Sequence, residues 1–120
     1  MKIKLPPLSE HEIQTQILHY LGYKGFYTMR LNSGMIPMQS AKGSRLIRMA
    51  QAGTPDIFAF GNKGVDNEVK LYFFEVKAEG KSATFLQEQK MIELTEHGAI
   101  CAVVHSIEEV KKVLKEYETN

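Results

Sequence analysis

Hydrophobic and polar residues form short blocks along this chain, and each block has the period of one kind of secondary structure. The first block has helical spacing, and its apolar members are Ile13, Ile17, Leu18 and Leu21. Ser9 and Glu12 precede it in the Ser-x-x-Glu order of a capping box, and Gly22 is a typical helix end. The pattern therefore predicts a first helix over residues 9–22.

The middle of the chain has the composition of β-strands separated by turns. Residues 26–31 are rich in strand-forming side chains. Residues 56–60 form a short apolar run entered through Pro55, which favours extended backbone before it. Residues 70–78 have the clearest strand pattern in the chain. Because the residues between the last two runs are turn formers, we expect an antiparallel hairpin there.

A long segment separates the first two predicted strands. Residues 32–54 contain four turn-forming residues, namely Gly34, Pro37, Gly43 and Gly53. We expect an irregular excursion from the core, with a helical turn near Ser44–Ala50. A loop of this length in a small domain is usually functional or mobile.

The C-terminal part of the chain predicts a helix, a strand and another helix. Thr84 and Gln87 form a second capping box, for a helix that reaches about His97 before Gly98. Residues 99–104 are a short apolar strand of the buried kind. A third helix is expected from Ser106 to Tyr117, capped by Ser106 and Glu109.

The predicted order is α-β-β-β-α-β-α. This order is typical of a compact α/β domain with a central mixed β-sheet flanked by helices. At 120 residues the chain is long enough for one core. We therefore expect a single domain over residues 1–120, with its core at about 9–117.

Composition narrows the class of protein further. Hydrophobic residues make up 43% and charged residues 24%, as in soluble globular proteins. No apolar run reaches the ~20 residues of a transmembrane helix, and the N-terminus lacks the apolar segment of a signal peptide. The single cysteine, Cys101, excludes an intramolecular disulfide and a cysteine zinc site. We expect a cytoplasmic protein, in the host cytoplasm if it is viral. The four histidines lack metal-ligand spacing and are expected at the surface.

Charge is unevenly distributed along the chain, although the net charge is only +1. Residues 1–55 sum to +5, from seven basic and two acidic residues, and residues 56–120 sum to −4, from eight basic and twelve acidic residues. Such a distribution fits a phosphate-binding surface beside a metal-binding cluster. The same cations could also be ordinary solvated surface.

The strand over residues 70–78 carries an acid and a base on one face. Because side chains alternate along a strand, Leu71, Phe73, Glu75 and Lys77 share one face, and Tyr72, Phe74 and Val76 share the other. An acid at the end of so apolar a strand is costly unless something compensates it. A surface ion pair would also explain Glu-x-Lys, so the tripeptide alone is a weak signal.

Asp56 begins the strand that is expected to pair with this one. Antiparallel pairing places Asp56 beside Glu75 and Lys77 rather than beside Lys70. Two carboxylates this close repel each other unless a cation or a proton lies between them. Hard oxygen ligands with open coordination positions suit Mg²⁺ or Mn²⁺.

The first helix offers a third carboxylate. At 100° per residue, Glu10 lies in the stripe of buried positions, whereas Glu12 lies opposite and is explained by its capping role. We therefore predict that Glu10 belongs to the site; the alternative is that it only favours the helix N-terminus electrostatically. Gln14, one turn later, faces the same way and could bind metal-bound water or phosphate.

Together these motifs resemble a known nuclease superfamily. Pro55-Asp56, then eighteen residues, then Glu75-Val76-Lys77 is similar to the Pro-Asp…Glu-x-Lys signature of the PD-(D/E)XK nucleases. Further features are similar to the VRR-NUC branch of that superfamily: Ser9-Glu10 at a helix start, the segment Arg30–Gly34, Gln87 eleven residues before Gly98, and the segment Val103–Glu109. The resemblance covers roughly Ser9 to Val113.

The resemblance implies a restriction-endonuclease-like core that hydrolyses DNA with Mg²⁺ or Mn²⁺. Asp56, Glu75 and the Val76 backbone carbonyl would be metal ligands, and Glu10 would hold the metal directly or through water. Lys77 would position and help deprotonate the attacking water, or stabilise charge in the transition state. Gln87 would assist on the second helix, although its capping box is an equally good explanation of that residue.

The resemblance and the polar and basic residues of the chain together predict the partners. Binding to the DNA backbone is assigned to Arg30, Asn32, Lys42, Arg45, Arg48 and Gln14. Stand-alone members of the branch resemble junction resolvases, so we expect a homodimer acting on branched DNA. The apolar run Gly34–Met38 is a candidate dimer contact, unless it folds back onto its own core. The alternatives are a flap or non-specific DNase of the same fold, or a non-catalytic nucleic-acid-binding module, which intact Asp56, Glu75 and Lys77 argue against.

Overall fold

The computed structural model describes residue 3 and residues 5–31, 35–40, 43–48, 51–61 and 68–118, with backbone alone for 35–40 and 43–48. The elements within these ranges are α1 (Glu10–Tyr23), β1 (Tyr27–Arg30), β2 (Met35–Ser40), β3 (Gly43–Arg48), β4 (Ile57–Phe60), β5 (Tyr72–Val76), α2 (Phe85–Glu96), β6 (Ile100–Val104) and α3 (Ile107–Tyr117). All seven predicted elements are present, in the predicted order. Two further strands, β2 and β3, lie between the first two predicted strands.

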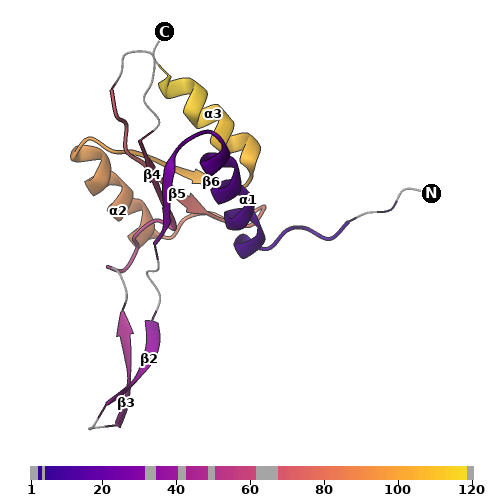
Figure 1. Cartoon of the computed structure of the whole chain (residues 1–120). Helices are drawn as coiled ribbons and strands as arrows, with labels where there is room; N and C mark the ends of the chain where they lie inside the picture. Colours follow the sequence, from indigo (N-terminus) through magenta and orange to yellow (C-terminus); the bar gives the residue numbers. More distant parts are fainter. Residues whose placement is uncertain are drawn as a thin grey trace.

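Four strands form the central sheet, in the order β1-β4-β5-β6 (Figure 1). The strands β1, β4 and β5 pair antiparallel, and β6 runs parallel to β5, so the sheet is mixed as predicted. In the β4–β5 hairpin Ile57 lies opposite Phe74, and Ala59 lies opposite Tyr72. This register confirms the predicted pairing of the two strands.

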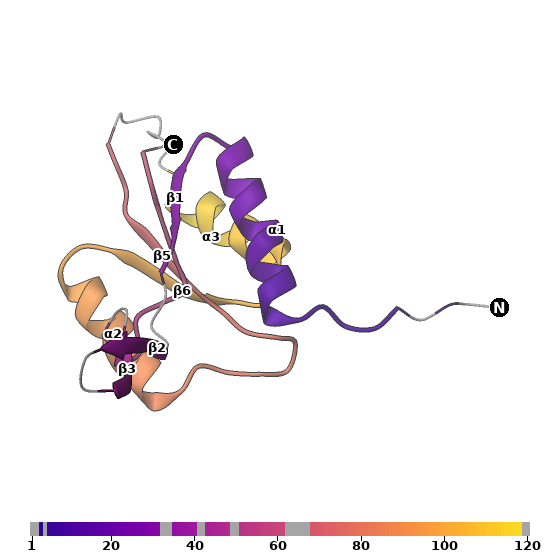
Figure 2. The same cartoon turned by 60° about the horizontal axis from the view of Figure 1, so that its bottom comes forward.

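One face of the sheet is covered by α1 and α3, which lie side by side in Figure 2, while α2 lies on the other side. The buried core fills the space under α1 and α3. It consists of Ile13, Ile17, Leu21, Ile57, Ala59, Tyr72, Phe74, Val76, Val104, Val110 and Leu114. The β5 side chains in this core are Tyr72, Phe74 and Val76, which the alternation along the strand predicted to share one face. The opposite face of β5 is therefore left to Phe73 and Glu75.

Two helix starts are fixed by the capping boxes that the sequence contains. The Ser9 hydroxyl accepts a hydrogen bond from the Glu12 amide at 3.1 Å, and the Glu12 carboxylate accepts one from the Ser9 amide at 3.2 Å. These contacts with Ser9 lower the pKa of Glu12. Thr84 and Gln87 make the same reciprocal contacts at the start of α2. No helix among the described residues is long and apolar enough to cross a membrane.

The segment between β1 and β4 differs from the prediction. The helical turn expected near Ser44–Ala50 is wrong, because Gly43–Arg48 is a strand that pairs antiparallel with Met35–Ser40. Pro37 is compatible with β2 because each strand of a two-stranded sheet has a free edge, where a missing N–H costs nothing. This hairpin projects away from the four-stranded sheet (Figure 1).

Candidate active site

The carboxyl groups of Asp56 and Glu75 meet where β4 begins and β5 ends. Since Ile57 lies opposite Phe74, the next pair along the two strands is Asp56 and Glu75. The Val76 amide donates a hydrogen bond to Asp56 Oδ2 at 2.8 Å, which fixes the Asp56 carboxylate at the end of β5. The structure thus brings these two acids together, as the pairing predicted.

The position of Asp56 depends on the loop that precedes it. Gly53 has a φ of +83°, and a Cβ atom there would lie 2.8 Å from the Leu86 carbonyl oxygen of α2. Only glycine fits both the backbone angle and this close approach. The Thr54 amide and hydroxyl donate to the Gln51 carbonyl at 3.1 and 2.6 Å, which closes the loop on itself. The loop therefore sits directly on α2.

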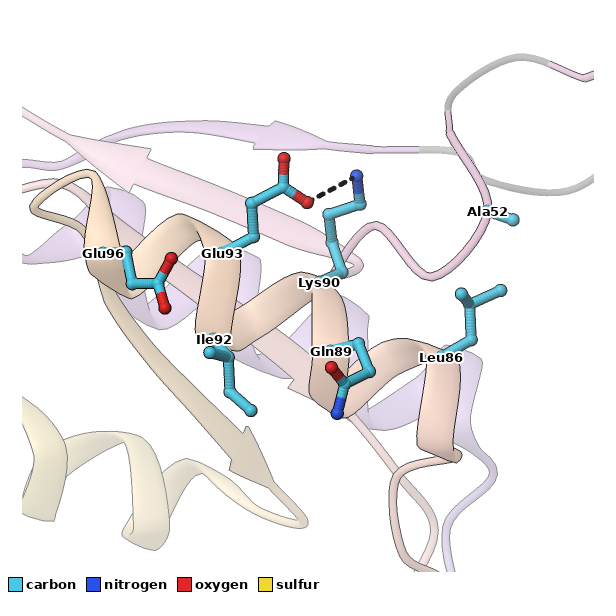
Figure 3. A pocket seen from close by; sticks show the side chains of 7 residues that line it. All are labelled: Ala52, Leu86, Gln89, Lys90, Ile92, Glu93 and Glu96. Atoms are coloured by element: carbon cyan, nitrogen blue, oxygen red, sulfur yellow. Dashed lines mark hydrogen bonds and ion pairs between the residues drawn. The ribbon is translucent and has the colours of Figure 1, made fainter.

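The side chain of Lys90 adds a second link between this loop and α2. Its ammonium group donates to the Gln51 side-chain oxygen and lies 3.5 Å from a carboxyl oxygen of Glu93. Figure 3 shows Lys90 and Glu93 on the side of α2 where the loop with Ala52 passes. The hollow between the loop and the helix has a volume of about 360 Å³. Because Lys90 and Glu93 are engaged with each other and Lys90 also with the loop, we assign this hollow a structural role.

Glu75 is the buried acid of the site. It is 3% exposed, and its Oε2 atom has no hydrogen-bond partner among the described residues. Its Oε1 atom lies 3.9 Å from the Lys77 ammonium nitrogen. Burial, and then the neighbouring charge of Asp56, raise the pKa of Glu75 to about 8, although Lys77 opposes the rise. The pair is therefore poised to hold a proton or a cation near neutral pH.

Asp56 shares this electrostatic environment. Burial raises the pKa of Asp56, and the hydrogen bond from the Val76 amide opposes that rise. The charge of Glu10 raises it further, as it also raises the pKa of Glu75. The site thus concentrates negative charge, with Lys77 as the compensating cation.

Glu10 reaches the site from α1. Its Oε2 atom accepts a hydrogen bond from the Ala78 amide at 3.5 Å, just beyond the end of β5. Glu12 is turned back into the cap with Ser9. The two acids therefore diverge as the helical phase predicted, and Gln14, one turn along α1, is partly buried.

A divalent cation fits the Asp56–Glu75 pair better than it fits the full predicted set. In the part of the chain that the structure describes, no three His, Cys, Asp or Glu side chains are grouped to hold a metal ion. The Glu10 carboxylate contacts the Ala78 amide instead of completing such a group. The Val76 carbonyl faces the same side of β5 as its amide, because both groups of a strand residue point the same way. The carboxylate pair, this carbonyl and the unpartnered Glu75 oxygen are suitable hard ligands.

The other predicted catalytic residues differ in their surroundings. Lys77 directly follows β5, its amide donates to the Val104 carbonyl at 3.0 Å, and its side chain is 13% exposed. The Gln87 side-chain oxygen accepts from the Thr84 amide at 2.9 Å. The capping role of Gln87 is therefore observed, while its catalytic role stays a prediction.

The residues predicted to bind DNA are only partly visible. Arg30 ends β1, and its guanidinium donates to the Thr15 hydroxyl at 3.4 Å. The backbone of β1 ends near Asp56, since the amide of the next residue, Leu31, donates to the Asp56 carbonyl at 2.6 Å. Arg45 and Arg48 lie on β3, in the projecting hairpin. Asn32, Lys42 and Gly34 lie outside the described residues, so the predicted contact at Gly34–Met38 is not tested.

The four histidines are exposed to different degrees. Three of them, His11, His19 and His97, are exposed as expected. His105 is only 31% exposed and contacts Glu109. The sequence signal was the spacing of four residues between His105 and Glu109, which brings side chains together across a helix start.

Comparisons with known proteins agree on the fold. No family model matches the sequence, and no curated protein matches it. A solved structure described as "VRR_NUC domain" is similar with a TM-score of 0.64 and 20% identity, covering 92% of this chain and 99% of that chain. Another, described as "VRR_NUC domain protein", gives a TM-score of 0.63 and 22% identity, covering 93% and 89%. The chain therefore has the VRR_NUC domain fold, as its motifs predicted.

Proposed function

From the VRR_NUC domain fold and the carboxylate pair of buried Glu75 and partly buried Asp56, we propose that this chain is a nuclease that hydrolyses DNA phosphodiester bonds with Mg²⁺ or Mn²⁺. The observation that carries the proposal is Glu75, which is 3% exposed beside Asp56 and has one carboxyl oxygen without a hydrogen-bond partner among the described residues. A buried acid beside a second acid costs folding free energy unless a cation or a proton lies between them. Groups perturbed in this way are common in active sites.

The residues of the site divide the chemistry between them. Asp56, Glu75 and the Val76 carbonyl would hold the cation, which when bound polarises the scissile phosphate and lowers the pKa of a water molecule. The Val76 amide orients Asp56 for this task through its hydrogen bond of 2.8 Å. Glu10, held by the Ala78 amide, would contribute through a water molecule.

Lys77 supplies the positive charge of the site. Its ammonium group lies 3.9 Å from Glu75 Oε1 and keeps 13% exposure, so it reaches solvent from the edge of the site. From there it can donate a hydrogen bond to the attacking water and position it. It can also stabilise the negative charge that develops on phosphate oxygens in the transition state.

We propose branched DNA as the substrate and a homodimer as the acting form. Arg30, Asn32, Lys42, Arg45, Arg48 and Gln14 would contact the sugar-phosphate backbone, which gives affinity without sequence reading. The hairpin that carries Arg45 and Arg48 leads along the chain into the loop before Asp56. A symmetric junction presents two equivalent strands, so two active sites related by a two-fold axis are the simplest way to cut both.

The test is cleavage of labelled four-way junction, flap, splayed-arm and linear DNA in Mg²⁺ or Mn²⁺, with light scattering of the same sample. We expect junction cleavage to be fastest, and a mass of twice the 13.6 kDa of one chain. A monomer that cuts flap DNA best would replace the junction assignment by that of a flap nuclease. Binding of all four substrates with cleavage of none, in any divalent metal, would favour a non-catalytic module.

A further inference from the structure

A tight turn directly follows the catalytic end of β5. The Lys81 amide donates to the Ala78 carbonyl at 3.0 Å, and Gly80 has a φ of +81°, which suits the third position of such a turn. The same turn contacts α1, because the Ala78 amide donates to Glu10. Its conformation therefore affects the surroundings of both Lys77 and Glu10.

The side chain of His105 also contacts this turn. Its Nε2 atom lies 2.6 Å from the Lys81 carbonyl oxygen. Its Nδ1 atom lies 2.9 and 3.1 Å from the two carboxyl oxygens of Glu109 on α3. A carbonyl and a carboxylate only accept hydrogen bonds, and a neutral imidazole has a single N–H. Both contacts can be hydrogen bonds together only when the imidazole carries two protons.

The groups around His105 favour its positive charge. A cavity of about 410 Å³ beside it is lined by Leu8, Ile13, Glu79, His105, Ser106 and Glu109. The charged groups that face the imidazole are Glu109 from α3 and Glu79 from the turn, while α1 contributes the apolar Ile13. The hydrogen bond to Glu109 raises the pKa of His105 most, the Lys81 carbonyl raises it further, and burial opposes both.

His105 is also connected to Lys77 through the end of β6. The residue before it, Val104, accepts a hydrogen bond from the Lys77 amide at 3.0 Å. The backbone of Lys77 is thus held at one point by Val104 of β6, and the turn that follows is held by the side chain of His105, the residue directly after β6. Loss of the contact between His105 and the Lys81 carbonyl would free the turn while leaving the sheet intact.

We propose that His105 is a positioning residue of the active site: as an imidazolium it joins the Lys81 carbonyl to Glu109 and so fixes the turn that follows Lys77. Its effect on catalysis rests on the nuclease function proposed above, whereas its effect on the turn does not. When His105 loses a proton it keeps only one of the two hydrogen bonds. The turn should therefore loosen, and cleavage should slow, as pH rises through the titration of His105.

The structural part is tested by NMR titration of the metal-free protein. We expect His105 to titrate above the ordinary histidine pKa of about 6.5, and the amide signals of Ala78, Gly80 and Lys81 to shift with the same midpoint. Glu109→Gln should lower that midpoint by about one pH unit, because it removes the opposite charge. Glu108→Gln is the matched control on the same helix, since Glu108 pairs with Lys111 at 3.6 Å. Turn amides that do not follow the His105 midpoint would overturn the proposal.

The catalytic part is tested by the pH profile of junction cleavage. Glu109→Gln should move the alkaline decline of kcat to lower pH by the same amount as the His105 midpoint, with KM unchanged. His105→Arg, which keeps a permanent cation, should flatten that decline. An active enzyme whose profile is the same in all three proteins would overturn the positioning role. If no nuclease activity is found, the proposed function fails, and the NMR titration still decides whether His105 fixes the turn.

Discussion

Replacing Glu75 by glutamine removes the ionisable group whose charge is least favourable in the metal-free fold. Its pKa is about 8 in the fold, against an ordinary value of 4.5. Between these two values the folded chain binds a proton that the unfolded chain does not bind. The free energy of unfolding of the metal-free protein should therefore fall as pH rises from about 4.5 to about 8, by up to ~1.4 kcal/mol per pH unit.

The size of the expected effect follows from that slope. From pH 4.5 to pH 7 the loss accumulates to at most about 3 kcal/mol, because each pH unit between the two pKa values costs a little over 1 kcal/mol. Glutamine has the same shape and no charge, so Glu75→Gln should recover most of this loss. It will not recover all of it, because the buried amide also needs hydrogen-bond partners. We expect a gain of about 2 kcal/mol at pH 7, or a rise in Tm on the order of 8 °C.

The assay is thermal unfolding in EDTA at a series of pH values from 4.5 to 8. The gain from Glu75→Gln should be near zero at pH 4.5 and grow as pH rises. Glu116→Gln, on an exposed position of α3, is the control and should change the melting curve little at any pH. If Glu75→Gln is no more stable than the wild type at pH 7, or gains as much at pH 4.5, the reasoning about the buried acid is refuted.

Three further predictions follow from the same site. In several millimolar Mn²⁺ or Ca²⁺ the wild type should melt higher than in EDTA, by ~2.7 kcal/mol when the metal is at about 100 times its Kd, and identical curves would count against a metal site. Gly53→Ala should destabilise the fold and reduce cleavage, since it forces a Cβ to 2.8 Å from a carbonyl oxygen at a φ of +83°. Gly22→Ala, whose Cβ would meet no atom of the described residues within 4 Å, should be neutral or stabilising in the same melting experiment. Glu10→Gln should slow cleavage more than Glu12→Gln, and the reverse ranking would contradict the assignment of Glu10 to the site.

Local signals in the sequence predicted much of the fold. The capping boxes of α1 and α2 were identifiable because their partners are three residues apart. The strand pattern of residues 70–78, together with the turn-forming residues before it, predicted the antiparallel hairpin that brings Asp56 beside Glu75. The helical phase predicted correctly that Glu10 and Glu12 point in different directions, because both residues lie in the first turn of α1.

Other features depend on contacts between distant residues, which no local pattern contains. The β2–β3 hairpin was missed because Pro37 and Gly43 resemble loop residues, while pairing is decided between the two strands. The contact of Lys90 with Gln51 joins residues 39 apart, and that of His105 with Lys81 joins residues 24 apart. The contact of Glu10 with the Ala78 amide joins residues 68 apart, and the part of Glu10 in holding a metal ion stays a prediction.

Cleavage of supercoiled plasmid in Mn²⁺ by the wild type and by Asp56→Asn tests the central claim most directly. Asparagine keeps the size of the side chain and an oxygen that can accept from the Val76 amide, so the fold should persist while the charge at the carboxylate pair is lost. We expect the wild type to relax and linearise the plasmid in Mn²⁺ and not in EDTA, and the variant to be at least ~10²-fold slower, as for loss of a central catalytic group. A wild type that is equally active in EDTA, or an Asp56→Asn protein that cuts at the wild-type rate, would contradict the assignment of a metal-dependent nuclease site to these residues.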